Sequence, residues 1–342
     1  MRVGFLGAGL IATFHSKMLR ASGEAFERAG VYDPDRARAE EFVARAGGGS
    51  FVCDTEDGVL DSCDAVYICT WTSEHPRLVE AAAERRLAVF CEKPLATTLD
   101  GARHMADVVE AAGVANQVGL ILRRSPAFNL LREIVSDPAN GRLMSVVFRD
   151  DQFIPVRGHY GSTWRGDVDK AGAGTLLEHS IHDVDMLEFV CGPIESVSAR
   201  SADFHQIEGI EDVVSATLQF ANGGLGVLTS VWHDVDPRGS LRRVEVFCER
   251  AYAVLEGDWF GPVRWTKADG SDGVLEGDAL VEHVRSALHD ELNPDGAFVR
   301  AVANGRPCSP DFREAVRAHE VTEAIYESAR YNGAPRGCGS PG

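Results

Sequence analysis

The stretch R-V-G-F-L-G-A-G-L-I-A, residues 2–12, determines the fold of the first part of the chain. An apolar run, read as a strand, ends in a glycine turn, and a helix is expected to open directly after it. This is the G-x-G-x-x-A form of the dinucleotide fingerprint, in which the helix N-terminus receives the phosphates. A βα turn without a ligand is the competing interpretation. We predict dinucleotide contacts at Gly7, Gly9, Leu10 and Ile11.

An acidic residue follows at the spacing that the fingerprint requires. A second strand, around residues 29–32, ends in Asp33, which is expected to accept hydrogen bonds from the adenosine ribose. Alternatively, Asp33 only caps the helix expected over 35–46, and the two roles can coexist. A carboxylate here favours NAD, whereas Arg36 and Arg38 leave NADP possible. Arg38 is included among the predicted cofactor contacts.

Two further apolar strands end in polar residues at the same predicted edge of the sheet. Thr70, Trp71 and His75 follow the strand at 65–69, and Glu92 and Lys93 follow the strand A-V-F-C at 88–91. In open α/β sheets, ligands bind outside the carboxyl ends of the strands, so we predict that all five contact the cofactor. The alternatives are a loop histidine that faces water and a solvated Glu-Lys pair.

The alternation of strands and helices defines two regions. It runs through about residue 135, which predicts a Rossmann-type doubly wound parallel sheet. Beyond residue 141, consecutive strands joined by tight turns predict a largely antiparallel open sheet, interrupted by one helix over 175–190. We therefore expect an α/β protein with a dinucleotide-binding domain at 1–122 and a substrate-binding and oligomerisation domain at 123–335.

Composition narrows the class of protein. The 342 residues carry a formal net charge of −18 without a basic run, which argues against a nucleic-acid partner. The absence of a long apolar stretch argues against a membrane partner, and the chain enters a strand almost at once, which argues against a signal peptide. We expect a cytoplasmic protein. The eight cysteines form no C-x-x-C pair and are interpreted as reduced, packed thiols.

A second group of chemically active residues lies at 171–185, A-G-A-G-T-L-L-E-H-S-I-H-D-V-D. Glu178 and His182 are four residues apart on the helix expected there, which would place both on one face. Proton transfer often uses such a set; a metal site and a solvated helix face are the alternatives, and we predict no metal. Upstream, Trp164 and its neighbours mix aromatic and polar groups as a carbohydrate pocket would, although Trp164 can equally belong to the core. The predicted substrate contacts are Lys93, Arg124, Tyr160, Trp164, Arg165, Glu178, His179 and His182.

These motifs together resemble the glucose-fructose oxidoreductase, inositol dehydrogenase and MocA family. The resemblance rests on the glycine turn at 7–9, on Glu92-Lys93-Pro94, and on the glycine-rich entry to the segment from Glu178 to Asp185. It implies a Rossmann domain, a second domain whose open mixed sheet forms a homodimer or homotetramer, and NAD(P)-dependent chemistry on sugars or cyclitols. The family's catalytic lysine falls on Lys93 and its catalytic histidine on His182. In two places the sequence departs from the family: Glu178 stands where an aspartate is frequent, and the usual triple glycine is Gly172-Ala173-Gly174.

The leading functional hypothesis is a dehydrogenase that moves a hydride between the nicotinamide and a secondary alcohol or ketone of a sugar, amino-sugar or cyclitol. Lys93, His182 and Glu178 are the predicted catalytic residues. One alternative retains the cofactor and uses transient oxidation to cleave a glycosidic bond. Another is a sugar-responsive regulatory protein on the same fold, since a fold does not fix a function.

Overall fold

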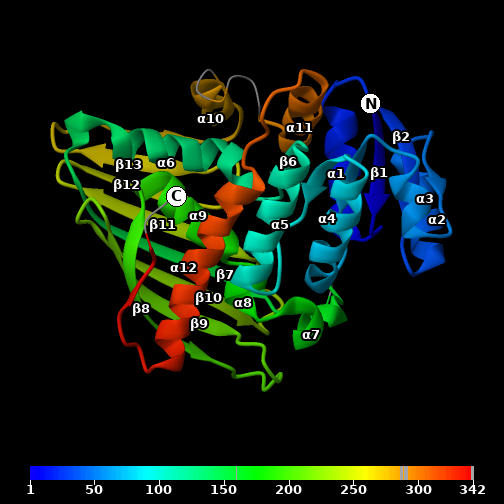
Figure 1. Cartoon of the computed structure of the whole chain (residues 1–342). Coiled ribbons are helices and arrows are strands. Elements are labelled where there is room, and N and C mark those ends of the chain that lie inside the picture. Colours follow the sequence, from blue (N-terminus) through cyan, green and yellow to red (C-terminus); the bar gives the residue numbers. More distant parts are fainter. Residues whose placement is uncertain (159, 286–287, 289–291, 340–342) are drawn as a thin grey trace. The chain divides into compact units, whose positions relative to one another are not determined.

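The structure, a computed structural model, describes residues 1–158, 160–285, 288 and 292–339. The chain forms two compact units, each made of two segments (Figure 1). The first unit contains Met1–Leu120 and Asn293–Val316, and the second contains Ile121–Leu292 and Arg317–Gly342. Within the predicted domain ranges, these units differ at residues 121–122, which belong to the second unit, and at residues 293–316, which belong to the first. This segment returns to the first unit because it carries α11 (Pro294–Ala303), whose apolar residues pack into the core of that unit.

The first unit is built on a six-stranded parallel sheet with the order β3-β2-β1-β4-β5-β6, the order of a doubly wound dinucleotide-binding sheet. Its strands are β1 (Arg2–Leu6), β2 (Glu27–Tyr32), β3 (Phe51–Val52), β4 (Ala65–Ile68), β5 (Ala88–Cys91) and β6 (Asn116–Val118). Its other elements are α1 (Leu10–Ala21), α2 (Arg36–Ala46), α3 (Glu56–Leu60), η1 (Thr72–Glu74), α4 (His75–Glu84), α5 (Leu99–Ala112), α11 and the start of α12 (Phe312–Arg330).

The central strands of this sheet are covered on both faces. In β5, Ala88 and Phe90 belong to one apolar cluster, whereas Val89 and Cys91 belong to a second cluster on the opposite face. All four residues of the strand are buried. A strand buried on both faces is apolar throughout, and for this reason the run A-V-F-C predicts its position correctly.

The second unit is built on a nine-stranded sheet with the order β14-β13-β12-β11-β7-β10-β9-β8-β15. β7 and β10 pair in parallel, and the other neighbours pair antiparallel. Its strands are β7 (Leu143–Phe153), β8 (Ile194–Ala202), β9 (Val213–Phe220), β10 (Leu225–His233), β11 (Leu241–Cys248), β12 (Ala251–Glu256), β13 (Val263–Lys267), β14 (Asp272–Leu275) and β15 (Arg336–Gly337). Its other elements are η2 (Ile121–Arg124), α6 (Pro126–Ser136), η3 (Pro138–Asn140), η4 (Thr163–Gly166), α7 (Val168–Ala171), α8 (Thr175–Glu178), α9 (Ile181–Cys191), α10 (Gly277–Val284) and the rest of α12.

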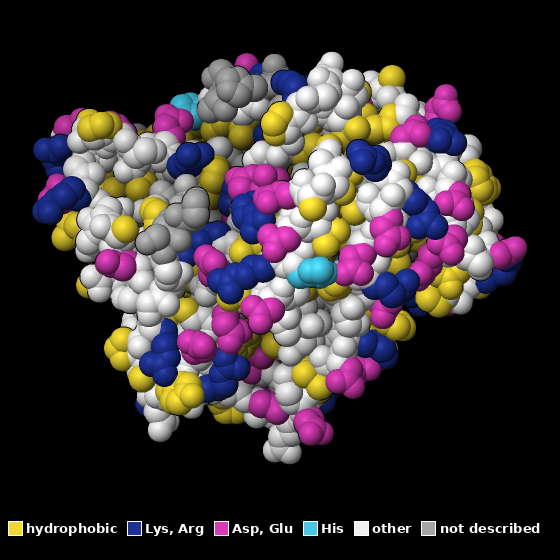
Figure 2. Space-filling view, in the orientation of Figure 1, with side chains coloured by type: hydrophobic (Ala, Val, Ile, Leu, Met, Phe, Trp, Pro, Cys, Tyr) yellow, Lys and Arg dark blue, Asp and Glu magenta, His cyan; other side chains and the backbone are white. Residues whose placement is uncertain are grey.

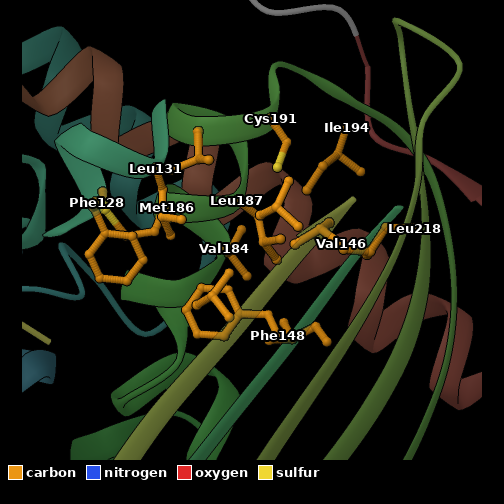
Figure 3. Packing of buried hydrophobic residues seen from close by; sticks show 14 of the residues in the cluster. Phe128, Leu131, Val146, Phe148, Val184, Met186, Leu187, Cys191, Ile194 and Leu218 are labelled. Atoms are coloured by element: carbon orange, nitrogen blue, oxygen red, sulfur yellow. The ribbon is translucent and has the colours of Figure 1, made fainter. Parts of the chain in front are cut away.

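Helices cover one face of this sheet. Phe128 of α6 and Leu187 of α9 point toward Phe148 of β7 in the apolar core between helices and sheet (Figure 3). On the opposite face, alternate residues of β9 such as Ser215 and Thr217 are exposed, as the alternating pattern of this strand predicts. The predicted fold class, a Rossmann domain followed by a largely antiparallel α/β domain, is confirmed.

Acidic and basic side chains are interspersed on the face of the molecule shown in Figure 2. Many of the basic groups have acidic partners; for example, Arg313 pairs with Glu110 and Asp107. Among the residues that the structure describes, no helix is long and apolar enough to cross a membrane. All eight cysteines are free thiols, and seven of them are buried.

Candidate active site

The glycine turn after β1 leads into the N-terminus of α1. Gly7 has a φ of 88°, and a Cβ at this position would lie 2.4 Å from the carbonyl oxygen of Cys69, so a larger residue does not fit. A Cβ on Gly9, by contrast, would meet nothing within 4 Å. Among the described residues, no side chain caps α1 and no acidic residue lies in its first turn. The first N–H groups of α1 can therefore bind an anion.

Asp33, at the end of β2, stabilises this turn by hydrogen bonding. Its Oδ2 accepts a hydrogen bond from the backbone N–H of Ala8 at 2.9 Å, and its Oδ1 accepts one from the N–H of Asp35 at 2.9 Å. Asp35, and not Asp33, caps α2. Each carboxylate oxygen of Asp33 has a second lone pair, so the side chain can brace the turn and still accept a ribose hydroxyl.

The loops after β4 and β5 lie at the same edge of the sheet. Thr70 follows the Cys69 carbonyl that contacts the glycine turn, and Trp71 is 38% exposed. His75, in contrast, is buried at 1% exposure, and its Nδ1 lies 3.0 Å from the carbonyl oxygen of Pro94. His75 therefore stabilises the loop that carries Lys93 and does so from the buried side of this loop.

Lys93 stands beside a buried ionic cluster that the sequence does not reveal. The Glu92 carboxylate accepts the Lys93 backbone N–H at 3.1 Å, and it lies 2.7 Å from Nε2 of His15 on α1. The other ring nitrogen of His15 lies 2.8 Å from Asp295 on α11. His15 and Asp295 are both fully buried. Burial opposes protonation of the imidazole, but the two carboxylates outweigh it and raise the pKa of His15 to about 10.

This protonated histidine predicts a pH dependence of stability. An unfolded histidine has a pKa near 6.5, so the stabilisation from folded His15 is fully present below that pH and is lost as pH rises toward about 10. We expect urea denaturation to give a higher free energy of unfolding for wild type than for His15→Gln. This difference should decrease steadily as the pH rises from 6.5 to about 10. An equal difference at both ends of this pH range would contradict the assignment.

In the second unit, the glycine-rich segment before Glu178 lets the start of α8 pack closely against Glu211. A Cβ on Gly174 would lie 1.8 Å from the carbonyl oxygen of Glu211. The Glu211 carboxylate accepts the backbone N–H groups of Gly174 and Leu176 at 2.7 and 3.0 Å. Gly174 is thus the position in Gly172-Ala173-Gly174 where close contact requires glycine.

The helix predicted over 175–190 needs a correction. It is two helices, α8 and α9, separated at His179 and Ser180, where His179 has φ −123° and ψ −61°. Glu178 and His182 are therefore not on one continuous helix face, and the i,i+4 argument for the pair fails. The break lets Ser180 bond to the Ser230 hydroxyl at 2.6 Å and turns His179 toward Asp150.

Glu178 is paired with Arg165, which was predicted independently as a substrate contact. The buried Glu178 carboxylate lies 3.1 Å from Nε of Arg165. Arg165 also donates to the Ser162 hydroxyl at 2.9 Å, and its guanidinium lies 4.5 Å from the centroid of the Trp164 ring. The structure thus joins three predicted substrate residues in one partly exposed cluster that offers hydrogen-bond donors and an aromatic face.

His179 belongs to a separate buried network in the same unit. Its Nε2 lies 2.7 Å from Asp150, and Arg242 bridges Asp150 at 3.1 Å and Asp183 at 2.6 Å. Burial raises the pKa of Asp183 to about 7; Asp150 adds to the shift and Arg242 opposes it. The two carboxylates can therefore share a proton near neutral pH.

The remaining predicted substrate residues are placed as follows. His182 is in the first turn of α9, immediately after the break, and is partly buried. Tyr160 and Trp164 are partly buried and pack against a small apolar cluster that contains Trp232, without being members of that cluster. Arg124 ends η2, next to Arg123, which pairs with Asp185 at 2.7 Å.

Sequence comparison agrees with this architecture in both units. Residues 1–120 match the sequence model described as oxidoreductase family, NAD-binding Rossmann fold. Residues 128–254 match the GFO/IDH/MocA C-terminal domain. The chain belongs to the Gfo/Idh/MocA oxidoreductase family. The resemblance inferred from the motifs is confirmed, and NAD is the cofactor for which the Rossmann domain of this family is named.

Several Gfo/Idh/MocA relatives match nearly the whole chain. The myo-inositol 2-dehydrogenase of Thermotoga maritima is 28% identical over 315 residues, 90% of each chain. The inositol 2-dehydrogenase of Rhizobium meliloti is 26% identical over 336 residues, 96% of each chain. A levoglucosan dehydrogenase solved with NADH and levoglucosan shares the fold with a TM-score of 0.86 at 21% identity, covering 99% of this chain and all of the other.

Proposed function

We propose that this chain is an NAD-dependent dehydrogenase that moves a hydride between the nicotinamide and a secondary alcohol or ketone of a sugar, amino-sugar or cyclitol. The observation that carries the proposal is Lys93 at the carboxyl end of β5, in the NAD-binding unit of a Gfo/Idh/MocA oxidoreductase. The inositol and levoglucosan dehydrogenases among the relatives support the substrate class.

The residues of the first unit fit a dinucleotide. The open space over Gly9 and the uncapped α1 can receive the pyrophosphate, with Leu10 and Ile11 in the first turn. Asp33 can hold the adenosine ribose, with Arg38 beside it. Thr70, Trp71 and Lys93 complete the proposed cofactor contacts on the loops after β4 and β5, whereas the buried His75 and Glu92 stabilise the loop that carries Lys93. When bound, NAD supplies the hydride acceptor, and the protein supplies position and charge.

Three residues are proposed to act on the substrate. Lys93 donates a hydrogen bond to the reacting oxygen and stabilises negative charge that develops there. His182 takes the proton of the reacting hydroxyl during oxidation and returns it during reduction. Glu178, held by Arg165, anchors the substrate together with Arg124, Tyr160, Trp164 and His179. Because Glu178 is paired with Arg165, we propose that it orients the substrate and that it does not transfer the proton.

A substrate panel tests this function. We expect NAD⁺ reduction, followed by nicotinamide absorbance, with at least one of myo-inositol, scyllo-inositol, levoglucosan or glucose 6-phosphate. A Lys93→Met variant assayed beside the wild type controls for contaminating dehydrogenases. If the protein binds NAD but reduces it with no member of a broad sugar and cyclitol panel, the proposed reaction is wrong.

Cofactor preference follows from charge at the ribose site. Asp33 accepts from a 2′-hydroxyl but repels a 2′-phosphate, and Arg36 is already paired with Glu40 at 3.1 Å and with Asp54. We expect NAD to bind at least about tenfold more tightly than NADP, the effect of roughly 1.4 kcal/mol. Asp33→Asn keeps an acceptor for the Ala8 N–H but removes the charge, and should narrow this ratio.

The matched control for this comparison is Asp35→Asn, two residues away. It makes the same charge change, and asparagine can still cap α2, so the ratio of the two dissociation constants should stay near the wild-type value. Calorimetric titration of both cofactors measures the ratio. Tighter binding of NADP by wild type, or equal effects of the two substitutions, would contradict the role of Asp33.

A further inference from the structure

The cluster of Glu92, His15 and Asp295 is not used by the reaction chemistry proposed above, yet it ends at Lys93. It joins three separate parts of the first unit: the end of β5, the middle of α1, and the first turn of α11. Both ring nitrogens of His15 lie within hydrogen-bond distance of a carboxylate. An imidazole can donate to two ionised carboxylates only when it is protonated, and these two short contacts fit the charged form that the raised pKa of His15 favours.

The charge of His15 determines the state of Glu92. Burial disfavours an ionised Glu92, but His15 and Lys93 overcome it and hold the pKa of Glu92 below its ordinary value. The Glu92 carboxylate in turn accepts the backbone N–H of Lys93 and attracts its ammonium group. Without the positive charge of His15, burial would favour the neutral acid, and Lys93 would lose the negative group beside it.

The other titratable groups that face the cluster stay neutral. Tyr67 and Cys69 come from β4 and its end, and Cys91 comes from β5; burial raises the pKa of each well above its ordinary value. Cys308 lies near Tyr67 and adds to the rise in the pKa of this tyrosine. The rings of Phe90 and Tyr67 pack against His15, with centroids 4.8 and 5.6 Å from it. In the part of the chain that the structure describes, the charged members of this cluster are therefore Glu92, His15 and Asp295.

We propose that His15 is a positioning residue for Lys93: by its ion pair with Glu92 it keeps an ionised carboxylate against the lysine, and Asp295 holds His15 in place. The role of Lys93 in catalysis rests on the proposed function, but the effect of His15 on the amine does not. Lys93 then remains an ammonium donor up to a higher pH than it would otherwise.

The titration of Lys93 can be measured without a substrate. Only the unprotonated amine reacts with acetic anhydride, so the acetylation rate of Lys93 against pH, read by peptide mass spectrometry, gives its titration curve. We expect His15→Gln and Glu92→Gln to shift this curve to lower pH by about one unit, the usual effect of losing one close opposite charge. The double variant should shift it no further than either single variant, because both act through one carboxylate.

Two controls separate this role from simple packing. Glu24→Gln breaks the 2.7 Å ion pair with Arg300, which also ties α11 to the first unit but does not reach Lys93, and should leave the curve unchanged. Lys17, exposed on α1, serves as an internal standard in every sample. If His15→Gln does not fold, Asp295→Asn carries the test, with a smaller shift in the same direction.

Activity provides the second readout. If the proposed function is correct, the alkaline limb of kcat should move to lower pH together with the acetylation curve. A shifted acetylation curve in a protein that oxidises no sugar would support the positioning role and reject the proposed function. An unchanged acetylation curve in folded His15→Gln or Asp295→Asn, accompanied only by lower stability, would overturn the positioning role.

Discussion

Replacing Lys93 by alanine is expected to lower kcat about a hundredfold or more while the affinity for NAD stays within a few-fold. The amine is assigned to the reacting oxygen, and loss of one charged hydrogen bond in a transition state costs about 3 kcal/mol. Initial rates at saturating substrate, with NAD binding measured separately by calorimetry, test both halves of this expectation.

The matched control is Lys17→Met, because Lys17 is the other lysine of the first unit and lies exposed on α1. It should retain wild-type turnover. Lys93→Met, which keeps the apolar stem of the side chain, should be as impaired as Lys93→Ala. Turnover near the wild-type level in either Lys93 variant would remove the lysine from the mechanism.

Replacing His182 by asparagine is expected to slow the reaction by about a hundredfold or more, the usual contribution of a positioned acid-base group. Oxidation requires the neutral imidazole, so the wild-type rate should rise with pH through the histidine titration, and the variant should lose this limb. A deuterium isotope effect on the transferred hydride must first show that chemistry limits the rate, since product release can hide the limb.

His179→Asn is the matched control for this histidine. It changes the same residue type three positions earlier, in the network with Asp150 and Arg242. We expect it to weaken substrate binding but to keep the rising limb of kcat. If His179→Asn removes the rising limb of kcat and His182→Asn preserves it, the proton acceptor is His179 and not His182.

The sequence predicts best those elements whose residue pattern is compatible with one type of secondary structure. β5 and α2 appear at the predicted positions, because an apolar run without polar interruption fits a doubly covered strand and because Asp35 and Gly47 mark the ends of α2. β12, β13 and β14 were not predicted. β14 is only four residues long and none of its residues is buried, so its apolar signal is weak.

The helix break at His179 could not be predicted from periodicity. Leu177, Ile181 and Val184 continue an apolar stripe with helical spacing straight across it. The break is decided by tertiary contacts: Ser230 lies 50 residues from Ser180 in the sequence, and Asp150, the partner of His179, belongs to a different strand, β7. The residues next to His179 and Ser180 in the sequence do not indicate these distant partners.

The buried cluster behind Lys93 was missed for a similar reason. His15 does leave a trace, since it occupies the buried face of α1 together with Ala12 and Leu19, where a polar side chain requires a partner. That partner, Asp295, lies 280 residues away, in a position that looks like an ordinary acid at a helix N-terminus.

The most direct test of the central claim follows the hydride itself. A sugar or cyclitol that reduces NAD⁺ in the panel is supplied with deuterium at its carbinol carbons, and the NADH formed is analysed by mass spectrometry. The account predicts NADH that carries one deuterium, with the matching ketone as the other product. NAD that is recovered unreduced while the sugar is cleaved or left unchanged would contradict it.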